Sequence, residues 1–445
     1  MRFRLAILSL LAPVVLAGCA VEAHAGFESA ADATATAVAQ AHPTSVPPLA
    51  LGKVAYIQGG DVWTKQLPDG KAYRLTQDGG DSWPLWSPSG TWLAFIRDQA
   101  LWTMRADGGD AHSLGPVAPG EGQVEWSVRG DRLAYISDGG LILTDADGSR
   151  EVRVVSGGGG EGAAALAWSP DGAWLAYEAE VRAPGKPPME QGLWRVRADG
   201  TGSERISLSP APAQIQYHLA GWSPDASELL YWQGMQLSAS LAADGEPLMA
   251  ISLSGGSPHR IVPIMLPYRS FLAWSPDGRT LAVVAGGGRQ TWANKVLLLA
   301  TLHGAPRRLT NPRTAMVAPA WSPEGHTLAV AIEIAGPVGQ ASTLRAVSGS
   351  HLWIVPANGP AATRLTSDPS FADDHPQWSR DGSTIVFARI HGQRAELWLV
   401  HADETGLRQI VAALTPSPLA LDYYGHIPWG AAYDYWTGSP PASSR

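Results

Sequence analysis

The chain has 445 residues, of which 16% are charged, and it contains 49 glycines and 35 prolines. This composition favours a turn-rich β protein over a helical one. The formal net charge of −8 at pH 7 gives no electrostatic reason to expect a nucleic acid as partner. A chain of this length would ordinarily hold two or three domains, but a closed array of repeats can form a single unit.

The N-terminus has the composition of an export signal. Two arginines precede an apolar run that is too short for a comfortable membrane-spanning helix, and small residues stand directly before Cys19, the only cysteine. The segment "LAGC" resembles the lipobox of bacterial lipoproteins. The resemblance implies a signal peptide at residues 1–18, cleavage before Cys19, and lipidation of its sulfur and of the new α-amino group. An ordinary secretory signal with an incidental cysteine is the alternative.

Residues 19–50 form the next segment, which is rich in alanine and threonine, ends in prolines and shows no strand alternation. Such a segment is typical of a flexible tether, and it is too short to hold another domain. Because lipidation would consume Cys19, we expect neither a disulfide nor a cysteine metal ligand in the mature protein. The expected anchor places the protein at the cell membrane or outer membrane, facing the periplasm or the extracellular side.

One phrase, a tryptophan followed by a tight turn and an alternating apolar run, occurs seven times. Its fullest form is "AWSPDGAWLAYEAE", which begins at Ala167. The seven tryptophans are Trp86, Trp126, Trp168, Trp222, Trp274, Trp321 and Trp378. Their spacings run from 40 to 57 residues, a period that indicates a propeller, a solenoid or an array.

Each repeat predicts four strands. In the last repeat these are "HPQWS", "STIVFAR", "ELWLVHA" and "GLRQIVA", with turns between them. In Ser-Pro-Asp-Gly, serine suits the first position of a type I turn, proline presets φ at the second, and glycine accepts the left-handed conformation that closes the hairpin. Asp-Gly and Asn-Gly pairs between the third and fourth strands are further hairpin signals.

Two incomplete repeats complement each other at the ends of this array. Residues 53–76 supply a second, third and fourth strand, and "GHIPWGAAYDYW" at 425–436 supplies a first strand, with Trp429 in the tryptophan position. Pairing of the two would close a ring. We therefore expect an all-β fold, a single propeller of eight four-stranded blades at 51–436, followed by a tail at 437–445. Seven blades are the alternative.

The phrases "WSPDG-x-x-LA", "LW-x-V-x-ADG" and "RLT" together resemble the TolB-type β-propeller repeat over nearly all of residues 53–436. The resemblance implies the fold and not the function, because such propellers serve many roles. The sequence departs from TolB in its expected lipid anchor and in lacking room for an α/β domain before the propeller, so we carry over no role in the Tol–Pal system. Related propellers cap prolyl-oligopeptidase-class catalytic domains. No G-x-S-x-G occurs in this sequence, however, and we expect no catalytic domain after Trp436.

The order of the strands sorts the connections onto two faces. The tight Asp-Gly turns lie on one face. The loops between second and third strands lie on the other and carry insertions in four consecutive repeats, at 179–192, 233–246, 285–295 and 333–350. Insertions that gather on one face often mark a binding face. Neutral drift of surface loops is the alternative.

Polar and aromatic residues just before each tryptophan enter the central channel at the loop-rich face. The expected partner-binding residues at this channel mouth are Asp81, Trp83, Glu121, Gln123, Tyr217, His218, Arg269, Asp373, Asp374, His375, Tyr424 and His426. In TolB the corresponding end of the channel receives partner proteins. The resemblance therefore implies that a protein or peptide docks here.

The sequence shows no catalytic constellation, and we expect no metal and no cofactor. The alternative at the mouth is a divalent ion, for which carboxylates and imidazoles are suitable ligands: Asp81, Asp373, Asp374, His375 and His426. Pectin-fragment lyases with a similar propeller use a metal and histidines in this region. The resemblance thus leaves an enzyme acting on a saccharide or lactone as the second hypothesis. The remaining histidines are expected to be solvated: His112, His259, His303, His326, His351, His391 and His401.

Taken together, these patterns predict a membrane-anchored lipoprotein of the cell envelope with a monomeric propeller. The propeller is expected to be a non-catalytic scaffold that binds a protein or peptide partner, with the propeller enzyme as the alternative.

The first prediction concerns the anchor. Cys19→Ser should release the protein from membranes or stall its processing, because the serine hydroxyl cannot form the thioether to the lipid. Membrane fractionation measures the release, and mass spectrometry maps the mature N-terminus. A mature N-terminus well downstream of Cys19 would contradict the prediction.

Overall fold

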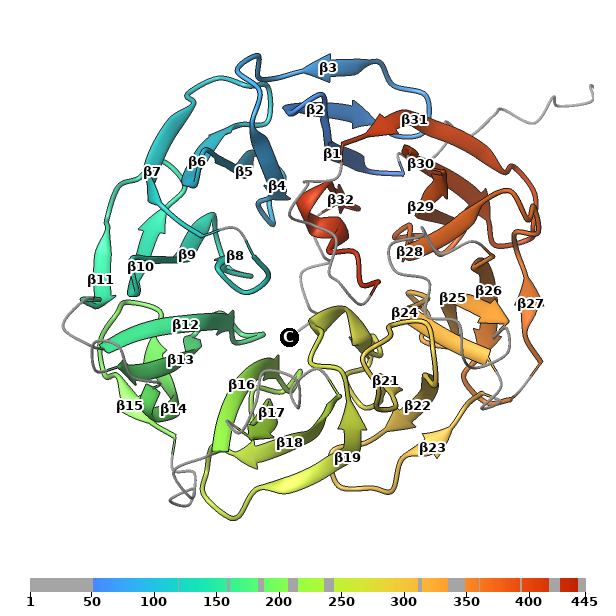
Figure 1. Ribbon diagram of the computed structural model, residues 1–445. Helices are drawn as coiled ribbons and strands as arrows, with labels where there is room; N and C mark the ends of the chain where they lie inside the picture. The colour runs from blue at the N-terminus through green and yellow to red at the C-terminus, as the bar shows by residue number, and fades with distance from the viewer. Residues whose placement is uncertain are drawn as a thin grey trace, which may run out of the picture. The chain divides into compact units, whose positions relative to one another are not determined.

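The computed structural model describes residues 51–118, 120–157, 161–182, 188–206, 215–235, 244–310, 314–334, 349–359, 361–392, 394–415 and 425–438. The expected signal peptide, Cys19 and the tether lie outside these residues. A compact unit extends from Ala50 to Arg445, and it is a ring of eight four-stranded antiparallel sheets (Figure 1). The expected eight-bladed propeller is therefore confirmed. No helix among the described residues has the length and apolar character needed to span a membrane.

The innermost strand of each blade lines the centre of the ring and ends at a tryptophan (Figure 1). The inner strands of blades one to eight are, in that order, β32 (Tyr433–Trp436), β4 (Asp81–Trp86), β8 (Val124–Trp126), β12 (Glu161–Trp168), β16 (Ile215–Trp222), β20 (Leu272–Trp274), β24 (Thr314–Trp321) and β28 (Ala372–Trp378). The second strands are the most deeply buried. They are β1 (Lys53–Gln58), β5 (Trp92–Arg97), β9 (Arg132–Ser137), β13 (Trp174–Arg182), β17 (Glu228–Met235), β21 (Leu281–Ala285), β25 (Thr327–Ile334) and β29 (Thr384–His391).

The third and fourth strands complete each blade toward the rim. The third strands are β2 (Asp61–Gln66), β6 (Ala100–Arg105), β10 (Gly140–Asp145), β14 (Pro188–Arg197), β18 (Glu246–Ser252), β22 (Val296–Ala300), β26 (His351–Pro356) and β30 (Arg394–His401). The fourth are β3 (Ala72–Arg74), β7 (His112–Pro116), β11 (Val152–Val155), β15 (Glu204–Arg205), β19 (His259–Met265), β23 (Arg307–Arg308), β27 (Thr363–Arg364) and β31 (Arg408–Leu414). Two 3₁₀ turns, η1 (Arg269–Phe271) and η2 (Trp429–Ala431), lead into inner strands.

The tight turn between the first and second strands is held by its own side chains. In blade five, Ser223 Oγ donates to Asp225 Oδ1 at 2.6 Å, and that oxygen also accepts the amide of Ser227 at 3.1 Å. The amide of Glu228 donates in turn to Ser223 Oγ at 2.9 Å. Hydrogen bonds from Ser223 and Ser227 lower the pKa of Asp225, because they favour its ionised form. The Ser-Pro-Asp-Gly pattern is thus explained by a compact hydrogen-bonded hairpin.

The inner tryptophans connect neighbouring blades. Each indole Nε1 of five blades donates to the carbonyl of the residue just before the tryptophan of the preceding blade. These bonds are Trp126–Leu85 at 3.0 Å, Trp168–Glu125 at 3.2 Å, Trp222–Ala167 at 2.9 Å, Trp321–Ala273 at 2.9 Å and Trp378–Ala320 at 3.0 Å. A large indole fills the wedge between blades, and its N–H donates a hydrogen bond that a phenylalanine, which has no such donor, could not make. The repeat spacing of tryptophan follows from this contact.

Apolar faces of adjacent blades form the core between them. Leu93 and Phe95 of blade two, both fully buried, pack in one cluster with Ala55 and Ile57 of blade one. A second cluster joins the other face of blade two to blade three. Every blade therefore buries both faces except at the rim, as a propeller requires.

The ring closes between the two ends of this unit. β32 pairs antiparallel with β1, with Val54 opposite Tyr435 and Tyr56 opposite Tyr433. The expectation that Trp429 fills the tryptophan position is wrong, because Tyr435 holds that position: it lies opposite Val54, as Trp86 lies opposite Leu93 in blade two. Trp429 lies in η2 instead, where a Trp-Gly-Ala turn interrupts the strand. The alternation that follows, with Tyr433 and Tyr435 buried, selects the later segment as the strand.

The second prediction tests closure. A chain that ends after Ala432 should lose at least roughly 10 °C in Tm, because removal of two buried tyrosines costs several kcal/mol and 1 kcal/mol shifts Tm by about 2–4 °C in a domain of this kind. Circular dichroism during heating measures the shift. A chain that ends after Gly438 is the matched control and should retain the parental Tm. Equal Tm values for the two truncations would refute the closure argument.

Candidate functional site

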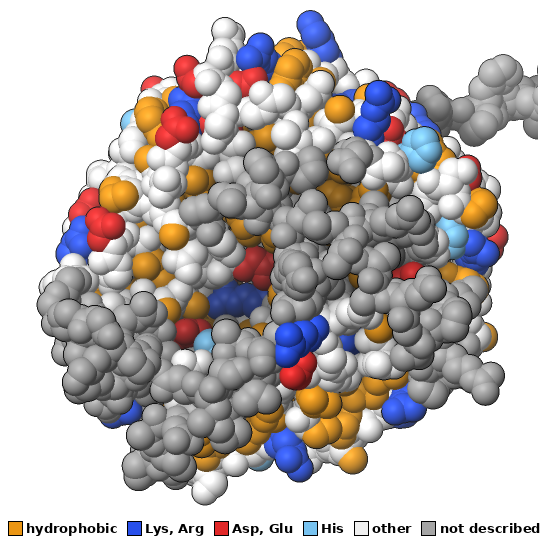
Figure 2. Space-filling view, in the orientation of Figure 1, with side chains coloured by type: hydrophobic (Ala, Val, Ile, Leu, Met, Phe, Trp, Pro, Cys, Tyr) orange, Lys and Arg blue, Asp and Glu red, His pale blue; other side chains and the backbone are white. Residues whose placement is uncertain are grey.

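The centre of the loop-rich face is a hollow with acidic, basic and histidine side chains inside it (Figure 2). Arg269 of η1 crosses from blade six toward blades three, four and five. Its guanidinium donates to the carbonyls of Leu166 at 2.8 Å and Leu219 at 3.2 Å, and it lies 3.5 Å from Glu125 Oε1. About a quarter of the Arg269 side chain remains exposed. The arginine therefore ties three inner strands together and still presents charge to the hollow.

Two glutamates face this arginine. Burial raises the pKa of Glu125, and attraction to Arg269 together with the amide of Trp168 opposes the rise. Glu121 is exposed by surface area, but the protein around it removes part of its hydration and raises its pKa, and Arg269 opposes that rise too. The two carboxylates and one guanidinium leave this part of the hollow acidic.

A second acidic group lies between blades four and five. His218 Nδ1 is 4.0 Å from Glu178 Oε2, and His218 Nε2 is 3.9 Å from Glu246 Oε1. Glu178 Oε1 also accepts the amide of Leu219 at 2.5 Å. Neither oxygen of Glu246 has a hydrogen-bond partner among the described residues, although the side chain is only 3% exposed. Burial raises the pKa of Glu246; His218 opposes this shift, and Glu178 adds to it.

Two aspartates expected at the mouth are buried in ion pairs. Asp81 binds Arg97 at 2.7 Å and also accepts from Thr76, and Asp373 binds Arg389 at 2.6 and 2.9 Å. Burial alone would raise the pKa of Asp373, but the nearby His351 ring, 4.0 Å away, and the hydrogen bonds from Arg389 outweigh it and lower that pKa. The expectation that these carboxylates are solvated is corrected, because each pairs with an arginine of the adjacent strand.

Asp374 and His375 are also part of the packed structure. Asp374 Oδ2 accepts Trp429 Nε1 at 2.8 Å, and Oδ1 accepts the His375 amide at 2.7 Å. Burial raises the pKa of Asp374 to about 6 and lowers that of His375 to about 4, because both charged forms lose hydration. His375 sits at a bulge with φ of 53°, and its ring lies edge-on to Tyr433 at 5.7 Å. These residues fix η2 and the closing strand.

His426 is buried as well. Its ring stacks on Tyr268 at 3.8 Å, and its Nε2 is 3.0 Å from Ser270 Oγ. It thus joins the closing segment to η1, next to Arg269. The expectation that His426 and Asp374 are exposed loop residues is therefore wrong.

The remaining expected residues divide between core and hollow. Tyr217 is 8% exposed and packs edge-on to Tyr231, so it belongs to the core. Trp83, with φ of 53°, is half-buried at a bulge, and Gln123 donates to the carbonyl of Ala164. Tyr424 lies outside the described residues. The structure therefore brings Glu121 close to Arg269 and places His218 against two other glutamates, and does not assemble the full expected ring.

The insertions are described only in part. Residues 179–182 and 188–192 lengthen the β13–β14 hairpin beyond the six-residue strands of blades two and three. At 285–295, the fully buried Lys295 donates to four loop carbonyls: Gly287, Gly288, Gln290 and Ala293. Burial lowers the pKa of Lys295 to about 8. Most of the insertions at 233–246 and 333–350 lies outside the described residues.

The divalent-ion alternative at the mouth does not find a ligand set in the described part of the chain. Asp81 and Asp373 are committed to arginines. One group of three potential ligands does occur among the described residues, Glu228, His259 and His303, but on the tight-turn side. The expectation that His351 is solvated is wrong, because it is 7% exposed beside Asp373. His259 and His303 do reach solvent, but both also approach Glu228.

Sequence reasoning missed Glu125, Glu178 and Glu246. Comparison between repeats held a signal for Glu178, which occupies a strand position where other repeats have Ile96, Ile136 or Val284. A carboxylate in place of an apolar residue on a buried strand needs a partner or a function. Glu246 follows an insertion, and its position in the repeat was therefore hidden.

No protein-family model matches this sequence, and neither does any curated protein. Solved structures do. The dipeptidyl peptidase 4 of Porphyromonas gingivalis has 12% identity and a TM-score of 0.55 over 80% of this chain and 57% of its own. A candidate dipeptidyl aminopeptidase IV of Bacteroides ovatus has 12% identity and a TM-score of 0.52 over 83% and 60%. A candidate TolB of Agrobacterium tumefaciens has 15% identity and a TM-score of 0.32 over 80% and 87%.

This chain spans 57% and 60% of the length of the two peptidase-type structures. At 12% identity, such similarity establishes a shared β-propeller fold and nothing about chemistry.

The third prediction concerns Asp374. Asp374→Ala should lower the free energy of unfolding by about 1–3 kcal/mol, because it leaves the buried Trp429 N–H without an acceptor. Glu121→Ala, at an exposed position of the same hollow, is the control and should change stability by no more than about 0.5 kcal/mol. Urea unfolding followed by tryptophan fluorescence measures both. A neutral Asp374→Ala would mean that this hydrogen bond does not support the closing segment.

Proposed function

We propose that this protein is a cell-envelope lipoprotein whose propeller binds a protein or peptide partner at the loop-rich face, through a cationic group that enters the central hollow. One observation carries the proposal: the buried Glu246 carboxylate has no hydrogen-bond partner among the described residues, although it lies beside the accessible His218. A buried carboxylate without donors is costly unless a ligand supplies them.

The charges around the hollow support the same ligand class. Among the contacts of the described residues, Glu121 and Glu125 face the guanidinium of Arg269, and Glu178 and Glu246 face the imidazole of His218. An ammonium or guanidinium group of a peptide would pair with these carboxylates in a partly desolvated site, where charge-assisted hydrogen bonds are strong. The loops around the hollow would then contact the rest of the partner.

A second candidate is an enzyme that acts on a saccharide or lactone. The observation that favours it is the imidazole of His218 between two carboxylates, at 4.0 and 3.9 Å. Glu246 with a raised pKa and His218 form a set that could move a proton on and off a bound substrate. Binding without turnover favours the scaffold, and turnover that is lost in His218→Ala favours the enzyme.

The fourth prediction tests the cationic ligand. Glu246→Gln should weaken binding of lysine- or arginine-containing peptides by roughly tenfold, which corresponds to about 1.4 kcal/mol. The variant should fold normally, because an amide of the same shape is easier to bury than an unpaired carboxylate. Fluorescence anisotropy with peptide pairs that differ only in lysine or glutamate measures the effect.

Asp277→Ala, in a tight turn of the opposite face, is the control for this test. In the parent, the hydrogen bond from Ser275 lowers the pKa of Asp277. The substitution removes this hydrogen bond and should leave peptide binding unchanged. Equal binding of lysine and glutamate peptides, or equal losses in the two variants, would overturn the proposal.

A further inference from the structure

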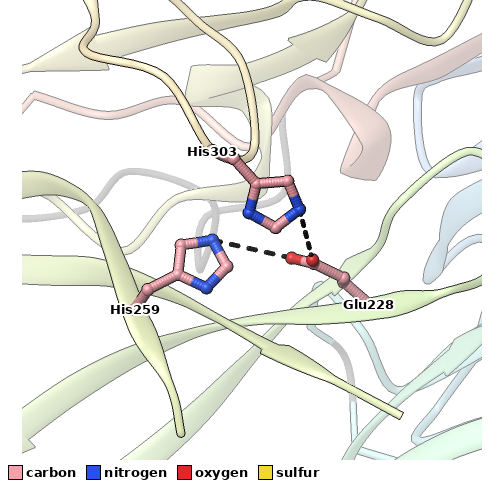
Figure 3. Close-up of side chains that lie close together, drawn as sticks. All are labelled: Glu228, His259 and His303. Atoms are coloured by element: carbon pink, nitrogen blue, oxygen red, sulfur yellow. Dashed lines mark ion pairs between the residues drawn. The ribbon is translucent and has the colours of Figure 1, made fainter. Parts of the chain in front are cut away.

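We propose that Glu228, His259 and His303 form a site for a divalent transition-metal ion, best suited to Zn²⁺, at the junction of blades five and six. The site lies on the tight-turn side and is independent of the proposed ligand in the central hollow. Figure 3 shows the three side chains converging from the start of β17, the start of β19 and the turn after β22. Their ligand atoms all lie within 4.8 Å of one another.

The distances suit a metal. His303 Nε2 is 3.0 Å from Glu228 Oε1, and His259 Nε2 is 3.7 Å from Glu228 Oε2 (Figure 3). Ligand atoms of a tetrahedral zinc ion are about 3.3 Å apart, as its bond lengths of about 2.0–2.1 Å require. The two observed separations go to different oxygens of the carboxylate, and one ligand atom from each residue lies within 4.8 Å of the others, so the side chains must rotate to bring all three onto one ion.

The carboxylate is built in rather than placed on the surface. The Glu228 side chain is 5% exposed, and its Oε2 has no hydrogen-bond partner among the described residues. Its backbone is fixed by the turn, since its amide donates to Ser223 Oγ and its carbonyl accepts the Ser223 amide. Glu228 Oε2 is thus fixed, buried and without a hydrogen-bond donor, on a carboxylate that faces two imidazoles. A metal ion would supply the partner that this oxygen lacks.

Comparison between repeats shows that two of the three residues, Glu228 and His303, depart from what the other blades carry at the same positions. Glu228 stands five residues after the turn serine, where other blades carry tryptophan, arginine or threonine: Trp92, Arg132, Trp174, Thr280, Thr327 and Thr384. His303 stands before the turn glycine, where three other blades carry an aspartate whose carboxylate caps its own turn: Asp107, Asp147 and Asp199. Because a histidine stands at this position in blade six, the turn there has no aspartate carboxylate to cap it. The replaced residues come from two neighbouring blades and meet at one point.

Access and ligand type complete the argument. The His303 side chain is 73% exposed and that of His259 is 32% exposed, so an ion can enter and water can fill the remaining coordination positions. Two imidazoles and one carboxylate are a ligand set that zinc accepts. The centroids of the two rings lie only 4.9 Å apart, close enough for both imidazoles to bind one cation.

In the metal-free protein His259 Nε2 donates a proton to the carbonyl of Leu302 at 2.7 Å. Binding through this nitrogen displaces that proton, and His303 must be neutral as well.

The fifth prediction uses the chelator-treated full chain titrated with ZnCl₂ in a calorimeter. All variants carry Cys19→Ser so that no thiol contributes. We expect one site per chain, weakened at least tenfold in His303→Asn. This variant should fold well, because it recreates the Asn-Gly turn that residues 358–359 form in blade seven. Glu228→Gln, which keeps the shape and removes the charge, should weaken zinc similarly.

His326→Asn is the matched control, because His326 is an exposed histidine beside another tight turn of the same face. It should leave zinc affinity unchanged. Thermal unfolding gives a second readout, in which zinc raises Tm in the parent and the control but not in His303→Asn. No zinc uptake by the parent, equal uptake in His303→Asn, or an equal loss in His326→Asn would overturn the proposal and leave the three residues as a hydrogen-bonded turn contact.

Discussion

The inner strands of the ring impose one requirement on which much of the structure depends. Each has a free edge toward the central hollow, and its amides and carbonyls need partners that no further strand supplies. The preceding blade provides many of them: Glu125 accepts the amide of Trp168, Glu178 that of Leu219, and Asp434 that of Trp86. Carbonyls on the same edges accept the tryptophan indoles and the guanidinium of Arg269.

This requirement explains why charge gathers in the hollow. Carboxylates at the inner edge satisfy backbone amides, and Arg269 satisfies carbonyls, so part of the polar lining exists to hold the ring together. Glu246 does not fit that account, because neither of its oxygens bonds a described residue and no inner-edge amide uses it. The same distinction separates Asp81 and Asp373, which arginines neutralise, from the groups that remain available to a ligand.

The two faces of the ring differ in how side chains hold the connections between strands. On the tight-turn side, serine and aspartate side chains close the hairpins of blades four, five, six and eight. Glu228, His259 and His303 interrupt that regularity at one junction between blades. The loop-rich side has no such repeated closure. Lys295 holds one long loop through four carbonyls, a solution that occurs once among the described blades.

The sequence by itself determined the repeat, the four strands of each blade, the Ser-Pro-Asp-Gly hairpins and the eightfold ring, because these features follow from local turn chemistry and from apolar alternation repeated seven times. Tertiary structure alone decided which aromatic takes the tryptophan position of the closing strand, since Trp429 and Tyr435 both follow a plausible strand pattern and only packing distinguishes them. Tertiary structure also decided which residues at the channel mouth are buried in ion pairs and which reach solvent. Whether an aspartate near a tryptophan strand is solvated depends on an arginine such as Arg97 or Arg389, one strand away and 16 residues along the chain. The meeting of Glu228 with His303 depends on the angle between neighbouring blades, which no local pattern encodes.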